Sequence, residues 1–174
     1  MPYTGGVSLD GGGFGGHEHE DAYDGGGFAW DESSALEKMR SFLMTFDGGA
    51  LSQMDIDYTD KVPNAGGLFP SGLVEVSRTK DLLGNVSVTN QYNFALYTTL
   101  EKWRDGTDNA EWQMAFQEWV QEQSVTGQAP TFGDDPREER ITAQNGAIYS
   151  ADPEGVAVYA IQISVSFTRH YGRR

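Results

Sequence analysis

Long runs of alternating apolar and polar residues in the last hundred residues limit the fold of this chain most strongly. Val156–Arg169 places apolar side chains at every second position and Gln, Ser or Thr between most of them. Val86–Leu96 repeats the period of two that is typical of a β-strand, and Leu73–Thr79 and Arg140–Ser150 also predict strands. Strands this long with one polar face suit the lining of a surface or tube, so the pattern favours assembly over catalysis.

Two helices are predicted beside these strands. The first begins at a capping box formed by Ser34 and Glu37 and ends at the glycines after Asp47. Its apolar face comprises Leu36, Met39, Leu43 and Phe46. The second runs from about Asp108 to Gln123, with Asp108 and Glu111 as a second capping box. Its apolar stripe, Trp112, Ala115, Phe116, Trp119 and Val120, is expected to pack on a sheet.

A short strand is predicted between the first helix and the long strands. Met54, Ile56 and Tyr58 should point inward, with Asp55, Asp57 and Thr59 outward, and Val62–Gly72 reads as a loop rich in Pro and Gly. Short connections between consecutive strands imply antiparallel neighbours. The sequence therefore predicts an α+β fold: a mainly antiparallel sheet with two helices packed on it.

Residues 1–31 form a separate compositional region, a glycine-rich acidic arm ahead of a folded domain at 32–174. Ten of the 22 glycines lie in the first 27 residues, and residues 1–32 carry seven acids without Lys or Arg. Such a segment cannot bury enough apolar surface to offset its ordering entropy. Phe14, Phe28 and Trp30 are spaced along it as candidate anchors, and we interpret the arm as a strap that orders on an adjacent subunit.

The bulk composition excludes several functions. A formal charge of −14 argues against a protein that binds nucleic-acid phosphates, although DNA could pass along such a protein without being bound. With no cysteine, the chain has no disulfide framework or thiolate metal site. No apolar run approaches the roughly 20 residues of a membrane span, and the first residues do not resemble a secretory signal. We expect a protein made in a cytoplasm.

Candidate chemical sites are few. His17 and His19, with neighbouring carboxylates, offer ligands for zinc or nickel, but a solvated acidic stretch explains the same residues. Asp55 and Asp57 could form a carboxylate pair, or simply an exposed strand face. Gly11, Gly13 and Gly16 match the glycine spacing of a dinucleotide-binding motif. That motif requires a strand before the glycines and a helix after them, and the sequence predicts neither. His170 has no visible nucleophile partner, so neither a catalytic residue nor a cofactor is predicted.

The segment from Leu73 to Tyr171 resembles small bacteriophage head–tail proteins, catalogued as minor capsid proteins or tail terminators. Some relatives carry a doubtful chloramphenicol-resistance label, and this chain lacks the His-x-x-x-Asp-Gly site of an acetyltransferase. The residues that carry the resemblance are Asp81–Asn85, Tyr92–Leu96, Trp112–Gln121, Ala129–Pro130, Arg140–Gly146, Tyr159–Phe167 and Arg169–Tyr171. The similarity extends weakly over most of residues 32–172.

The resemblance implies a structural virion protein without catalytic residues, located in the tail–neck region after assembly in the host cytoplasm. Its family forms rings, usually hexamers, that cap the tail tube and dock on the head connector or stopper protein. Asp55 and Asp57 are then candidates for an acidic lumen wall that DNA passes without specific binding. Another neck or tail-tube subunit fits the same patterns. An acidic metal-binding protein or enzyme is the alternative from a different class.

Overall fold

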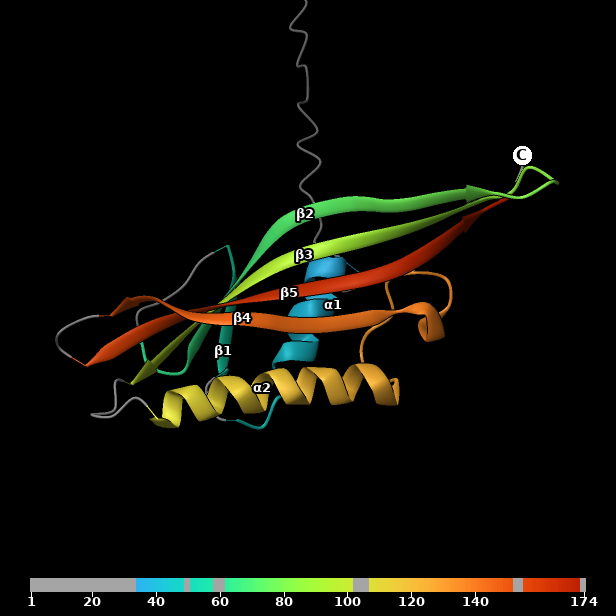
Figure 1. Cartoon of the computed structure of the whole chain (residues 1–174). Coiled ribbons are helices and arrows are strands. Elements are labelled where there is room, and N and C mark those ends of the chain that lie inside the picture. Colours follow the sequence, from blue (N-terminus) through green and yellow to red (C-terminus); the bar gives the residue numbers. More distant parts are fainter. Residues whose placement is uncertain (1–33, 49–50, 58–61, 102–106, 152–154, 173–174) are drawn as a thin grey trace, which may run out of the picture.

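The computed structural model describes residues 34–48, 51–57, 62–101, 107–151 and 155–172 (Figure 1). Two α-helices and five β-strands make up the fold, with one short 3-10 helix, η1. Their bounds in chain order are α1 (Ala35–Leu43), β1 (Gln53–Ile56), β2 (Ala65–Lys80), β3 (Val86–Glu101), α2 (Thr107–Thr126), η1 (Pro136–Glu138), β4 (Arg140–Ala151) and β5 (Val156–Tyr171). The predicted α+β class is confirmed.

The five strands form one sheet in the order β1-β2-β3-β5-β4. β2, β3, β5 and β4 pair antiparallel, and β1 pairs parallel with β2. Both helices contribute to one buried cluster with the sheet, Met39, Phe42 and Leu43 from α1 and Phe116 and Val120 from α2. The helices therefore share one face of the sheet, and no helix of the described residues covers the opposite face.

The predicted alternation in β3 and β5 is confirmed. In β5, the side chains of Ile161, Ile163, Val165 and Phe167 are fully buried, whereas Gln162 between them is exposed. In β3, Val88, Phe94 and Leu96 are buried on the same face. Each strand continues beyond its predicted end, β3 to Glu101 and β5 to Tyr171. The two strands pair without interruption from Val86↔Tyr171 to Glu101↔Val156.

The prediction of a loop at residues 62–72 is wrong, because β2 begins at Ala65. The glycines and the proline that predicted a loop have other roles here. A Cβ on Gly66 would lie 3.1 Å from Leu51 Cδ2, so the strand approaches its neighbour closely there. Gly72 adopts φ +111° at a shift in the β2–β3 register, which is where bulges use glycine. Pro70 lies beyond the β1 pairing, where its missing amide leaves no bond unmade.

The antiparallel prediction is also wrong for the first strand pair. Gln53–Ile56 runs parallel to Ala65–Leu68, and the connection leaves β1 through Asp57, with φ +58°, and reaches β2 through Asn64, with φ +67°. Asp and Asn tolerate this left-handed conformation better than other non-glycine residues. Asp57 is therefore past the end of β1, and the predicted pair of aspartates on one strand face is not formed. Tyr58 and Thr59 lie outside the described residues.

The helix boundaries differ from their prediction at three places. Ser34 caps α1 by accepting the Glu37 amide at 3.2 Å, but the Glu37 carboxylate binds Arg40 at 2.7 Å instead of completing the box. α1 ends at Leu43, so Phe46 follows the helix. α2 starts at Thr107, which puts Asp108 within its first turn rather than at its cap.

Aromatic packing joins the two helical segments over the sheet. Phe46 contacts the rings of Trp112, Phe116 and Trp119 at centroid distances of 5.8, 5.3 and 5.2 Å. The Trp112 indole donates to the Gly48 carbonyl at 3.1 Å, which satisfies its N–H. The two tryptophans thus belong to the core, as predicted. Ala115 is exposed, contrary to the predicted stripe, and Gln113 is buried in its place against Gly146 of β4.

Thr98 of β3 supplies a prediction about stability. Its side chain is fully buried on the core face, and its hydroxyl makes no hydrogen bond within the described structure. Replacing it with valine removes an unsatisfied polar group, so Thr98→Val is expected to stabilise the protein by about 1 kcal/mol. Urea unfolding followed by circular dichroism measures this.

Thr89→Val is the matched control in the same strand. The Thr89 hydroxyl lies 3.4 Å from that of Thr168 and is only partly buried. The substitution is expected to leave stability unchanged or slightly lower. Equal stabilisation by both variants would contradict the explanation and would instead indicate a general strand preference for valine.

Candidate functional site

The face of the sheet that no described helix covers, which we call the open face, carries polar side chains over four strands. Registered positions across β2, β3, β5 and β4 carry hydroxyl and amide side chains there. They are Ser77, Thr79, Ser87, Thr89, Gln91, Asn93, Thr142, Gln144, Gln162, Ser164, Ser166 and Thr168. On this face of β3, β4 and β5, carboxylate, guanidinium and imidazole side chains occur only at strand ends, as Glu101, Arg140 and His170. A chain of net charge −14 thus presents a broad uncharged face.

Hydrogen bonds between neighbouring strands hold these side chains in place. Asn93 Oδ1 accepts from Gln91 Nε2 at 2.7 Å and from Ser164 Oγ at 3.0 Å. Asn145 donates to Gln162 at 2.8 Å across β4 and β5. Because several of these polar groups bond to one another, they can meet another surface with a smaller desolvation cost than unpaired groups would have.

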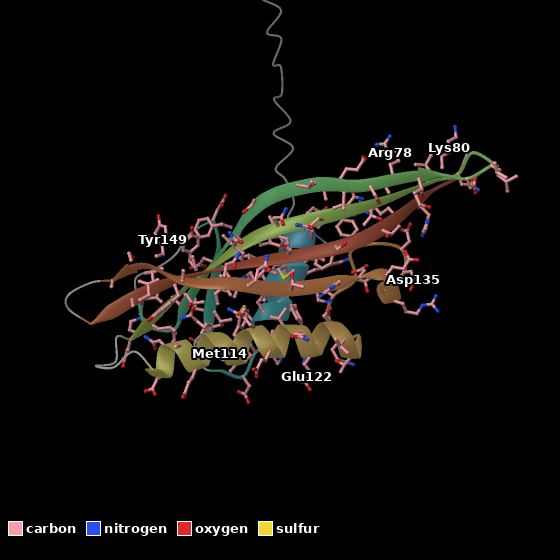
Figure 2. All side chains as sticks on the ribbon, viewed as in Figure 1. Arg78, Lys80, Met114, Glu122, Asp135 and Tyr149 are labelled. Carbon is pink, nitrogen blue, oxygen red and sulfur yellow. The ribbon has the colours of Figure 1, made fainter. Side chains whose placement is uncertain are left out.

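Aromatic side chains interrupt the polar surface at one end of the open face. Phe69 of β2 contacts Tyr97 of β3 at 5.1 Å, and Tyr97 contacts Tyr149 of β4 at 5.0 Å, both edge-on. They border a shallow cavity of about 400 Å³ that also involves Ser71, Ala95, Ser150 and Val158. Tyr149 is 68% exposed and points away from the sheet in Figure 2.

The two acids predicted for a lumen wall are separated by the structure. Asp55 registers with Gly67, which in turn registers with Tyr97, so Asp55 lies on the open-face side of β1. Asp57 is exposed in the turn after the strand, where its amide donates to the Leu68 carbonyl at 3.0 Å. Of the two acids, only Asp55 therefore lies within β1, on the side of the open face.

The β2–β3 hairpin extends beyond the helices and carries exposed leucines at its tip (Figure 1). Asp81 organises the turn: its carboxylate accepts from the amides of Leu83 and Asn85 at 2.9 and 2.8 Å and from the Asn85 side chain at 2.8 Å. The bond from the Asn85 side chain is the main reason the pKa of Asp81 is lowered. Leu82 is fully exposed and Leu83 is 77% exposed, so the turn presents an apolar tip.

Near the hairpin tip, His170 has a neighbour that the sequence did not reveal. Its Nδ1 lies 2.8 Å from Ser87 Oγ, and its Nε2 lies 3.9 Å from Glu138 Oε2. Strand pairing places Ser87 opposite His170, although 83 residues separate them. The three residues resemble a hydrolase triad in composition, but the carboxylate is beyond hydrogen-bond distance. His170 is exposed, and the larger cavities of the described chain have other linings.

The predicted metal ligands and arm anchors lie outside the described residues. This applies to His17, His19, Phe14, Phe28 and Trp30. Within the described ranges, no group of three or more His, Asp or Glu side chains could hold a metal ion. No helix in those ranges is both long and apolar enough to cross a membrane.

No protein-family model matches the sequence, and a search of curated proteins returns no match. The geometry of the sheet and its surfaces is therefore the basis for a functional assignment, together with the resemblance in sequence described above.

Proposed function

We propose that this protein is a structural component of a phage tail–neck, a tail terminator whose copies form a ring. The ring caps the tail tube and joins it to the head connector or stopper protein, and DNA passes through it. The observation that carries the proposal is the open face: four strands together place twelve uncharged hydroxyl and amide side chains on it, in a strongly acidic chain.

An uncharged face of this kind suits contact with moving DNA. Lys and Arg side chains lining a channel would bind DNA phosphates and displace the counterions from the DNA, which would slow the passage of the genome. Hydroxyl and amide side chains that already bond to one another offer little to a phosphate. Asp55 beside the face adds a repulsive charge, whose range is about 8 Å at physiological salt. This arrangement favours a channel through which DNA passes over one that binds DNA.

A second candidate function has the same observation in its favour. A tail-tube subunit or another neck subunit would also place a polar sheet face toward DNA. The two differ in what they do to the tail: a terminator stops tube growth, whereas a tube subunit extends it. An enzymatic role is not favoured, because the Ser87–His170–Glu138 group is exposed and lacks the acid–histidine hydrogen bond.

The described domain is expected to assemble without the N-terminal arm. Its core cluster contains 16 buried residues, all of them between Met39 and Phe167, so a chain that starts at Asp31 should fold. Native mass spectrometry of that chain, with and without tail-tube protein, should show rings of a single size. Tails assembled without the protein should vary in length under the electron microscope, and added protein should restore a uniform length.

Three results would count against this proposal. An unfolded chain would show that the domain boundary is misplaced. A folded chain that never joins tails would make the arm the assembly element. Uniform tail length without the protein, together with its presence along the whole tube, would favour a tube subunit over a terminator.

A further inference from the structure

The outer edge of β2 has no partner along most of its length within the described structure. β1 pairs with Ala65–Leu68 only, and the strand continues for another twelve residues to Lys80. Leu73, Val74 and Val76 are 52, 52 and 57% exposed along this stretch. Unpaired backbone beside apolar side chains is a template for an added strand, which natural proteins normally cover.

An apolar pocket lies beside this edge, at the point where the N-terminal segment joins the domain. It has a volume of about 230 Å³ and is lined by Ser34, Ala35, Leu36, Pro70, Gly72, Leu73, Tyr92, Asn93 and Phe94. Ser34, the first described residue, is itself part of the lining of this pocket.

The residues just before Ser34 contain the matching side chains. Trp30 precedes Ser34 by four residues and Phe28 by six. A four-residue connection spans at most about 14 Å, which is enough to turn back onto the adjacent pocket. An aromatic side chain buries about 150–250 Å², so one ring would cover much of the apolar lining.

The edge carries two cations near the hairpin tip, whereas residues 1–32 carry seven acids and no Lys or Arg. Arg78 and Lys80 project from β2 near the hairpin tip (Figure 2). Arg78 is paired with Glu75 at 2.7 Å, whereas Lys80 has no ion pair with any described residue. If Trp30 lies opposite Leu73 and the segment runs antiparallel to β2, Asp24 falls opposite Thr79, which precedes Lys80 and follows Arg78 but points to the other side of the sheet. Three glycines, Gly25–Gly27, lie between Asp24 and Phe28 and can follow the bulge in β2.

We propose that residues 24–30 add to the outer edge of β2 of the same copy as an antiparallel strand, with Trp30 in the pocket beside Ser34. The inference does not depend on the ring function. The three aromatic anchors of the arm then have different roles. Trp30 and Phe28 pack on the domain of their own chain, and Phe14 remains available to reach a neighbouring subunit. The own copy is favoured because closing a short loop costs little entropy, whereas recruiting a second copy adds the cost of association.

Engineered disulfides in the full-length chain test the proposal, because the natural sequence contains no cysteine. In the proposed register Ala29 lies directly opposite Val74, and facing residues have Cα atoms about 4.5–5.5 Å apart, within disulfide range. The Ala29→Cys, Val74→Cys variant is expected to form an intrachain disulfide with glutathione disulfide as oxidant. Intact mass and a non-reducing gel identify it. Ala29→Cys with Thr79→Cys, about 17 Å further along the strand, is the matched control.

Hydrogen exchange gives a second readout that needs no cysteine. Peptides covering Leu73–Lys80 should exchange about tenfold faster in Trp30→Ser than in the natural chain, because the edge loses its cover. Trp30→Phe should restore most of the protection. An interchain disulfide in the Val74 variant would overturn the assignment to the same copy. Equal cross-linking in both cysteine pairs, or exchange unaffected by Trp30→Ser, would overturn the strand itself.

Discussion

Phe116→Ala is expected to destabilise the protein by about 3–5 kcal/mol, the usual cost of truncating a buried phenylalanine. The Phe116 side chain is fully buried, stacks on Trp112 at 5.5 Å with an interplanar angle of 5°, and meets Phe46 edge-on at 5.3 Å. Its removal leaves a cavity where α2, the segment after α1 and the sheet meet. A domain of this size has only about 5–15 kcal/mol of stability, so a large share would be lost.

Thermal and urea unfolding measure the effect, with a fall in Tm of roughly 10–15 °C expected. Met114→Ala in the same helix is the matched control, since Met114 is 62% exposed and alanine is a good helix former. That variant should stay within about 0.5 kcal/mol of the natural protein. Comparable losses in both variants would mean that α2 is stabilised by its own helical propensity and not by the Phe116 contacts.

The second large effect concerns DNA, and it tests the proposed channel. Gln162 lies in the middle of the open face on β5 and is exposed. Gln162→Lys places one cation per subunit at the proposed wall, so an assembled ring should change from a non-binder to a DNA binder. The affinity should fall by about a thousandfold between 50 and 200 mM salt if about six phosphates are contacted. Fluorescence anisotropy with labelled duplex, and genome ejection from particles, measure the change.

Gln121→Lys is the control, because it makes the same substitution at an exposed position on α2, on the helical side of the sheet. It adds the same charge away from the proposed channel and should leave ejection unaffected. DNA binding by both rings alike would show that the response follows net charge and not position. Strong binding by the natural protein at physiological salt, or an assembled lumen dominated by Lys and Arg, would contradict the proposal as a whole.

Sequence patterns predicted the strands best where side-chain period and burial coincide. β3, β4 and β5 appear where alternation indicated them, because a period of two allows only one face to be buried. The patterns failed at Ala65–Gly72, where Gly and Pro indicated a loop. In the structure Gly66 allows a close approach to Leu51, and Gly72 lies at a bulge in the strand. Neither role can be recognised from the sequence, because both depend on which segments become neighbours in the fold.

The candidate site was predictable only in part. The polar face of β5 is evident from Gln162, Ser164, Ser166 and Thr168, but its continuity with Asn93 and Thr142 depends on strand order. Sequence spacing suggested that Asp55 and Asp57 share a strand face, and the positive φ of Asp57 prevents it. The Ser87–His170 contact joins residues 83 positions apart and has no local signal.

The sequence by itself determined the α+β class, the faces of the long strands and the aromatic face of α2, because side-chain periodicity and hydrophobic burial are local properties of the chain. Tertiary structure decided the parallel pairing of β1 with β2, the union of polar faces into one open face, and the pocket beside Ser34. These depend on which strands become neighbours, and register between distant segments is set by packing and backbone hydrogen bonds in the folded sheet.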